Sequence, residues 1–195
     1  MHDTVARPDE DSALIDRSRT TPEAFAEIFD RHAEAVHRYL ARRAGGSVAD
    51  DLTSETFLVA FGQRTKYDLT RTDARPWLYG IATNLLRRHR RVEVRQYRAM
   101  ARTGVDPVAD GDADRVVARV AASAASRRLA LALARMPAGE RDVLLLIAWE
   151  ELGYGQVAEA LGIPVGTVRS RLHSARRRLR ASLADLDPVH LTETD

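Results

Sequence analysis

Apolar residues recur at helical spacing in several separate stretches of the chain. The first stretch follows Thr21-Pro22-Glu23 and carries Phe25, Ile28, Phe29, Val36 and Leu40. Recurrence every three or four residues indicates one buried face of an α-helix. Thr21 fits the N-cap, Pro22 fits the first helical position and Gly45-Gly46 ends the pattern. We therefore predict a helix from Thr21 to residue 44, preceded by a short helix at residues 13–17.

Two further helices complete the N-terminal half. Ser47 is the N-cap we predict for the second, which runs to about Phe61 with Val48, Leu52, Phe57, Val59, Ala60 and Phe61 as its apolar set. Residues 63–73 are polar, and we expect a loop there. Pro76 opens the third helix, whose apolar residues are Leu78, Ile81, Leu85 and Leu86. We expect this helix to continue unbroken into the basic run that follows.

An acidic segment separates this half from the rest. Residues 103–114 hold Gly, Pro and four Asp with almost nothing to bury, which is typical of a linker. Helices are then predicted over residues 116–136, where Pro137 breaks the pattern, and over the strongly apolar residues 138–149. No alternating strand pattern occurs. The predicted fold is all-α, with two small helical domains at residues 21–100 and 116–184. A flexible acidic linker at 101–115 joins them, a tail with a short helix covers 1–20, and a second tail covers 185–195.

Residues 154–180 carry the spacing of a helix-turn-helix. A short helix presents Val157 and Leu161, Gly162 supplies a left-handed turn residue and Pro164 prevents the first helix from continuing. The second helix buries a narrow stripe made of Val168, Leu172, Ala175 and Leu179. Small polar residues and arginines cover its remaining faces, and this pattern fits the major groove of DNA. The alternative is a solvated basic face on a terminal helix.

Charge adds a second candidate surface. The chain has 195 residues and a net charge of only +2, but its 30 basic residues include a single lysine, Lys66. A GC-rich genome explains most of that arginine bias, so the positions of the arginines are more informative than their number. Within one short stretch lie Arg87, Arg88, Arg90, Arg91, Arg95 and Arg98. This stretch indicates a phosphate-tracking surface, with a solvated helix end as the alternative.

Aromatic and amide side chains precede this basic stretch. Tyr79 and Asn84 share a helix with Trp77 beside the polar loop at 64–75. Aromatic rings can stack on exposed bases, and an amide can hydrogen-bond a base edge. For Trp77 itself we favour core packing.

Several classes of protein are excluded by what the sequence lacks. It contains no cysteine, which rules out disulfides, cysteine-ligated metals and a cysteine nucleophile, and fits a cytoplasmic protein. No apolar run reaches the roughly 18–20 residues that span a bilayer, and the N-terminus lacks the pattern of a secretory signal. The histidines are scattered, and no phosphate loop or nucleophile elbow occurs. We expect a protein that is not an enzyme, with no catalytic residue, metal or cofactor.

Four runs of residues, taken in order, resemble a known family. They are ADDLTSETFLVAF, RPWLYGIATNLLRRHRR, LARMPAGERDVLLL and GYGQVAEALGIPVGTVRSRLHSARRRL. Together they resemble bacterial RNA polymerase sigma factors of the sigma-70 family, extracytoplasmic-function group, over residues 22–98 and 126–182. The resemblance implies two helical domains, region 2 and region 4. It also implies binding to core RNA polymerase (β′ clamp and β flap) and to promoter DNA, together with an anti-sigma partner and no membrane insertion.

The resemblance also implies roles for individual residues. The residues implied to contact polymerase are Asp50, Asp51, Ser54, Glu55 and Phe57. The loop at 64–75 is implied to hold a flipped base of the −10 element. The residues implied to contact this element are Arg64, Lys66, Tyr79, Asn84, Arg87, Arg88, Arg90 and Arg91. Contact with the −35 element falls to Thr167, Arg169, Ser170, Arg171, His173, Ser174 and Arg177.

The sequence departs from the family pattern at three places. Ser54 replaces a usual Gln, Ser174 replaces a frequent Arg, and Gly153 and Gly155 open the helix-turn-helix where a capping Ser and a Glu are usual. A second interpretation stays open as well. The C-terminal half also resembles a LuxR-like helix-turn-helix regulator, which binds operator DNA without polymerase, although the N-terminal half lacks the alternating pattern of a receiver domain.

Overall fold

The structure is a computed structural model that describes residues 10–103 and 116–183, with side chains described in 10–103 and 124–183. Within these ranges all regular structure is helical, and no strand occurs. The α-helices are α1 (Asp11–Arg17), α2 (Ala26–Ala44), α3 (Gly46–Gln63), α4 (Arg75–Arg88), α5 (Arg90–Thr103), α6 (Val116–Arg135), α7 (Ala138–Ala148), α8 (Tyr154–Leu161) and α9 (Val165–Leu183). Two short 3-10 helices are added at η1 (Pro22–Phe25) and η2 (Arg64–Lys66). The all-α prediction is confirmed, and the short helix predicted at residues 13–17 is present as α1. Most of the predicted linker, residues 1–9 of the predicted N-terminal tail and the predicted C-terminal tail lie outside the described residues.

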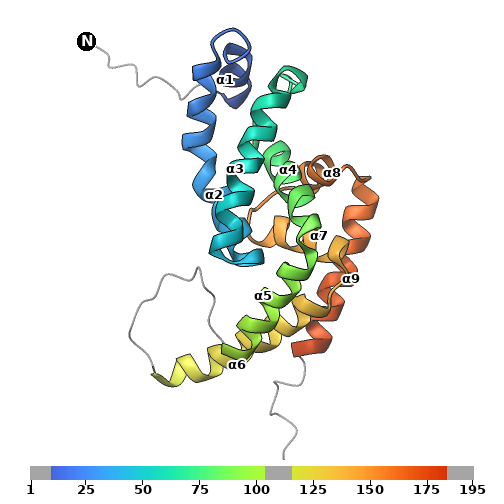
Figure 1. Ribbon diagram of the computed structural model, residues 1–195. Helices are drawn as coiled ribbons and strands as arrows, with labels where there is room; N and C mark the ends of the chain where they lie inside the picture. The colour runs from blue at the N-terminus through green and yellow to red at the C-terminus, as the bar shows by residue number, and fades with distance from the viewer. Residues whose placement is uncertain (1–9, 104–115, 184–195) are drawn as a thin grey trace, which may run out of the picture.

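The N-terminal half is built around α2, α3 and α4. Gly45 alone connects α2 to α3, so these helices form a tight hairpin (Figure 1). Ile28, Val36 and Leu40 of α2 are buried as their spacing predicts, and Leu52 of α3 faces them in the same core. Phe29, which we placed on the same face, is instead 45% exposed, although its ring packs on Phe57.

Both predicted N-caps in this half are wrong. Thr21 makes no side-chain capping hydrogen bond, because Pro22 begins a 3-10 turn and α2 starts only at Ala26. Ser47 lies inside the first turn of α3, which starts at Gly46. Gly45 is the single residue between the end of α2 and the start of α3, so no position is left there for a capping side chain.

The predicted single helix across the basic stretch is divided in two. The helix α4 ends at Arg88, His89 takes a non-helical conformation (φ −98°, ψ 19°), and α5 starts at Arg90. Neither Gly nor Pro marks this break. It changes the direction of the chain, and Tyr97 of α5 is thereby fully buried while Glu93 is only 3% exposed.

The C-terminal half follows the predicted pattern closely. Pro137 separates α6 from α7, and α8 and α9 form the helix-turn-helix. Gly162 takes the left-handed conformation (φ 62°, ψ 40°), where a side chain would be strained. The missing cap at Gly153 is compensated, because Gln156 Oε1 accepts the Gly153 N–H at 2.9 Å.

The two halves pack against each other and share one hydrophobic core. In Figure 1, α4 lies beside α8, and α5 runs along α6. The buried side chains of the shared core include Leu78 and Leu86 from the first half and Val143 and Val157 from the second. Both predicted helical domains are present, and they are in contact with each other.

Among the described residues, no helix combines the length and the apolar character that crossing a bilayer requires.

Candidate nucleic-acid interface

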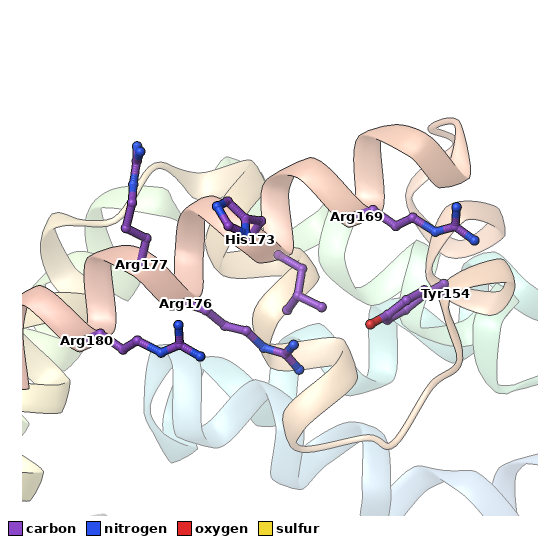
Figure 2. A pocket seen from close by; sticks show the side chains of 7 residues that line it. Tyr154, Arg169, His173, Arg176, Arg177 and Arg180 are labelled. Carbon is purple, nitrogen blue, oxygen red and sulfur yellow. The ribbon is translucent and has the colours of Figure 1, made fainter.

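One face of α9 is open and strongly basic. A hollow of about 440 Å³ is lined by Leu172 and by Tyr154, Arg169, His173, Arg176, Arg177 and Arg180. Figure 2 shows their side chains projecting from α9, with Tyr154 reaching in from the start of α8. Arg169, His173 and Arg177 follow each other at intervals of four residues and are all exposed, so they share one side of the helix. Such a row can contact phosphates and guanine edges.

The remaining predicted residues of α9 lie elsewhere. Arg171 is half-buried over the first turn of α7, where its Nη1 would come within 3.0 Å of a Cβ at Gly139. The Ser170 hydroxyl donates to the Thr167 carbonyl oxygen at 3.1 Å. Thr167 and Ser174 are half-buried. The structure thus gathers Arg169, His173 and Arg177 on the open face and turns Arg171 toward α7.

Three further residues of this face were not predicted from the sequence, namely Tyr154, Arg176 and Arg180. The arginines could have been found from their spacing, because positions 169, 173, 176, 177 and 180 fall on one side of a helix. Tyr154 could not have been found in this way, because it comes from another helix.

The loop before α4 is held in a fixed shape. Tyr67 is buried, and its hydroxyl donates to the carbonyl oxygens of Arg71 at 2.7 Å and Asp73 at 3.3 Å. Asp68 accepts the backbone N–H and the hydroxyl of Thr70 at 3.0 and 2.7 Å. These hydrogen bonds lower the pKa of Asp68. Trp77 packs on Tyr67 with ring centroids 4.8 Å apart, which agrees with a role in packing.

The predicted −10 residues around this loop differ in accessibility. Lys66 and Asn84 are exposed. Arg64 is half-buried, and it donates to the carbonyl oxygens of Ser18 at 3.1 Å and Phe61 at 2.7 Å. Tyr79 is only 2% exposed, and its hydroxyl donates to Glu150 Oε2. Burial and this hydrogen bond raise the pKa of Tyr79.

The basic stretch after Asn84 is exposed at the junction of α4 and α5. Arg87, Arg88, Arg90 and Arg91 are all exposed. Arg87 donates to Asn84 Oδ1 at 2.9 Å, and Arg88 lies 3.7 Å from Glu55 Oε1. These two contacts are at the surface and weak, so both arginines can exchange them for phosphates. Arg87 Nη2 also lies 3.5 Å from Oδ2 of the buried Asp142.

A second kind of surface lies on α3. Asp50, Asp51 and Ser54 are exposed there, and Leu58, one turn beyond Ser54, is 71% exposed. Phe57 is buried against Phe29, with ring centroids 4.9 Å apart. Leu58 was not predicted as part of this face. The sequence could have indicated it, because Leu58 falls outside the apolar stripe of α3 and beside its acidic residues.

Asp50 and Glu55 at the edges of this face have surface partners. Asp50 Oδ1 lies 2.9 Å from His37 Nε2, and Glu55 faces Arg88 across the α3–α4 boundary. The face as a whole combines exposed carboxylates with one large apolar side chain, which is a composition suited to docking on a basic protein surface.

Across residues 10–103 and 116–183, no three His, Asp or Glu side chains group closely enough to hold a metal ion. The described pockets belong to the surfaces above. The fold and the surfaces define an all-helical DNA-binding protein with a helix-turn-helix, a second basic surface and an acidic docking face.

Comparison with known proteins narrows this class to one family. Residues 28–96 match "Sigma-70 region 2" and residues 126–179 match "Sigma-70, region 4". The ECF RNA polymerase sigma factor SigW of Bacillus subtilis strain 168 is 31% identical over 175 residues, covering 84% of this chain and 91% of SigW. The ECF RNA polymerase sigma factor SigC of Mycobacterium tuberculosis (strain CDC 1551 / Oshkosh) is 35% identical over 159 residues, or 80% of each chain. The chain therefore belongs to the extracytoplasmic-function group of RNA polymerase sigma factors.

Solved structures agree with this assignment. The structure of CnrH in complex with the cytosolic domain of CnrY aligns with a TM-score of 0.63 at 25% identity, covering 91% of this chain and 98% of that one. The sigma factor RpoE in complex with the anti-sigma factor NepR from Bartonella quintana aligns with a TM-score of 0.58 at 22% identity, covering 82% and 96%. The second likeness concerns the fold alone.

Proposed function

We propose that the protein is a transcription initiation factor that binds core RNA polymerase and directs it to two-part promoters. The observation that carries this proposal is one chain that joins region 2 to region 4, each with its own exposed surface. Polymerase supplies the chemistry, and this chain supplies sequence recognition and no enzymatic activity. We expect it to act in the cytoplasm, where polymerase and chromosome meet.

We assign the −35 element to the open face of α9. Arg169, His173 and Arg177 are exposed on one side of the helix, and Arg176 and Arg180 extend the basic surface beside them. The apolar stripe of α9 is buried against the rest of the half, so the helix is presented rigidly to the major groove.

We assign the −10 element to α4 and the loop before it. Asn84 and Lys66 are exposed beside a loop that Tyr67 holds in shape, and the arginines after Asn84 can follow the adjoining phosphates. Strand opening then results from differential binding. Flipping a base costs a few kcal/mol, which stacking and hydrogen bonds worth ~1–3 kcal/mol per base can offset.

We assign contact with the polymerase β′ clamp to the acidic face of α3, made of Asp50, Asp51, Ser54, Glu55 and Leu58. In this assignment Phe57 packs in the core beneath the face. Leu58 makes the apolar contact with polymerase that the sequence had assigned to Phe57. Region 4 is expected to meet the β flap, and an anti-sigma protein is expected as a further partner.

The experiment is run-off transcription with purified core polymerase and a library of random promoter sequences. We expect core-dependent initiation at selected sites that share two separated elements. Binding to operator DNA with no effect of core polymerase would contradict the proposal and would support the LuxR-like alternative, which no comparison favours.

A further inference from the structure

Helix α1 lies at the same end of the N-terminal half as the segment that connects α3 to α4 (Figure 1). We call residues 64–74 of this segment the −10 loop. Leu14 and Ile15 of α1 are fully buried in the core that also holds Phe25 of η1. Because these apolar side chains fix α1 in the core, the polar groups at its two ends have fixed positions from which they can hold the loop.

The C-terminal end of α1 holds the start of the −10 loop through two hydrogen bonds. Arg19 Nη2, just after the helix, donates to the carbonyl oxygen of Tyr67 at 3.0 Å. In the opposite direction, Arg64 Nε donates to the carbonyl oxygen of Ser18 at 3.1 Å. The Arg64 guanidinium also lies over the ring of Phe61, 3.9 Å from its centroid. Both guanidinium groups therefore bind protein groups at this end of the loop.

The N-terminal end of α1 holds the other end of the −10 loop. Asp11 Oδ2 accepts the backbone N–H of Ala74 at 2.9 Å, and the same oxygen lies 2.9 Å from His32 Nε2 of α2. Ala74 is fully buried, whereas Lys66, which we assign to the −10 element, is exposed between the two attached ends of the loop. One short helix thus joins both ends of the −10 loop to the core.

We propose that α1 positions the −10 loop for DNA, with Arg19 and Arg64 as positioning residues that do not themselves contact the nucleic acid. This inference rests on the proposed function. A loop that holds a flipped base binds it more tightly when its shape is set beforehand, because ordering the loop on binding would lower the affinity. The hydrogen bonds of Tyr67 and Asp68 set the shape of the loop. Helix α1 sets where that shape lies relative to Asn84 of α4.

The salt dependence of DNA binding distinguishes a positioning arginine from one that binds a phosphate. A side chain that neutralises one phosphate of a single strand contributes about 0.7 to the slope of log affinity against log salt. Removing a positioning residue lowers the affinity and leaves that slope unchanged. Lys66→Ala gives the reference for a true contact in the same loop, because Lys66 is exposed and its loss should reduce the slope.

Arg19→Ala and Arg64→Ala each remove one attachment between α1 and the −10 loop. Arg19→Lys keeps a positively charged donor at the same place and should restore the function that Arg19→Ala loses. The charge-matched control is Arg38→Ala in α2, which removes an arginine paired with Glu34 of its own helix at 3.4 Å. Circular dichroism and urea unfolding check that each full-length variant is folded.

The free protein gives a first readout that needs neither polymerase nor DNA. The chain has two tryptophans, and Trp77 packs on Tyr67 with ring centroids 4.8 Å apart. In a Trp149→Phe background, the fluorescence of Trp77 therefore reports on the −10 loop. Acrylamide should quench it more strongly in Arg19→Ala than in Arg38→Ala, and Arg19→Lys should restore the wild-type value. Equal quenching in all these variants would overturn the attachment of the loop to α1.

Holoenzyme assembled from core polymerase and each variant gives the second readout. The probes are a labelled single strand with the −10 sequence obtained by run-off selection and a labelled duplex with the −35 sequence. If the released loop keeps its binding shape for roughly one tenth of the time, Arg19→Ala and Arg64→Ala lose about tenfold in affinity for the single strand. The salt slope and the affinity for the duplex should not change. A slope reduced as in Lys66→Ala, an equal loss on the duplex, or stronger quenching with no loss of affinity would each overturn the positioning role.

Failure of the proposed function gives a different pattern. In that case the wild type itself would not bind core polymerase, while the quenching of Trp77 would still report whether α1 holds the −10 loop.

Discussion

At the scale of single residues, Asp11 shows how one side chain can organise a terminus. Its Oδ2 lies 2.9 Å from His32 Nε2 and accepts the Ala74 N–H at 2.9 Å, and Arg31 approaches its other oxygen at 3.4 Å. It therefore joins α1 to α2 and to the start of α4. Burial alone would raise the pKa of Asp11, but the hydrogen bonds from His32 and Ala74 and the nearby positive charges lower it below 3.8.

This lowered pKa predicts a pH-dependent effect of Asp11→Asn. A carboxyl group whose pKa is lower in the folded state stabilises the fold above its unfolded pKa, and loses that contribution as the pH falls through the folded value. Asp11→Asn should therefore reduce the free energy of unfolding by about 1–3 kcal/mol at pH 6. The difference from the wild type should shrink as the pH falls below 4.

Urea denaturation of both proteins at several pH values measures this difference. Asp16→Asn is the control, because the Asp16 side chain is 60% exposed and should change stability little at any pH. A loss of stability by Asp11→Asn that stays constant down to pH 2 would contradict the assignment.

At the scale of elements, α9 carries two neighbouring arginines with different tasks. Arg177 lies on the open basic face. Arg178 turns to α7, where its Nε donates to Glu140 Oε2 at 2.9 Å. The two residues have the same charge and adjacent positions, so comparing them separates recognition from general electrostatic attraction.

We predict that Arg177→Ala weakens binding of selected promoter DNA by about 1–3 kcal/mol. It should also reduce the slope of log affinity against log salt by about 0.9, as expected for one lost phosphate contact. Arg178→Ala removes the same charge and should change neither quantity appreciably. Fluorescence anisotropy of the polymerase complex over a salt series measures both, and equal losses in the two variants would refute this division of α9.

The exposed leucine of α3 gives a second prediction at this scale. Burying a leucine in an interface contributes about 1.5–3 kcal/mol, so Leu58→Ala should weaken core polymerase binding by roughly tenfold or more. Leu129→Ala in α6 removes another exposed leucine and should leave binding unchanged. Because Leu58 is 71% exposed, the stability of the free protein should not change. Unchanged core affinity for Leu58→Ala would exclude this face from the interface.

Much of the helical pattern could be predicted from the sequence, because its signals are local. Pro137 breaks a helix wherever it occurs, and Gly162 suits a left-handed turn that other residues resist. The break at His89 had no such signal, since its cause is the packing of α5 beneath the other half. Glu93 and Arg141 look like ordinary surface charges in the sequence, and only their partners from distant helices make burial possible.

At the scale of the whole molecule, four buried charged residues set how strongly the two halves are joined, namely Arg43, Glu93, Arg141 and Asp142. Burial would lower the pKa of Arg43, but the charges of Tyr39, Glu93 and Asp142 outweigh burial and raise it well above its usual range. Burial raises the pKa of the adjacent Tyr39 to about 12. Over the physiological range both groups therefore keep one charge state.

We predict that Glu93→Gln destabilises the protein by about 3–5 kcal/mol, because the buried Arg141 would lose its carboxylate partner and Arg43 would keep only Asp142. Glu34→Gln is the control, since the Glu34 side chain is 89% exposed and exposed pairs contribute at most ~1 kcal/mol. Equilibrium unfolding in urea measures both. A loss below ~1 kcal/mol for Glu93→Gln would show that this charge group does not hold the halves together.

The buried charges between the two halves also determine what each half would carry if the contact between them opened. The first half brings Arg43, Arg87 and Glu93 to this group, and the second half brings Arg141 and Asp142. If the halves parted, the second half would be left neutral at this site and the first half with one excess positive charge, although Arg43 would keep Glu93 as its counter-ion. Ionic strength should have little effect on the contact between the halves, since buried ions are poorly screened.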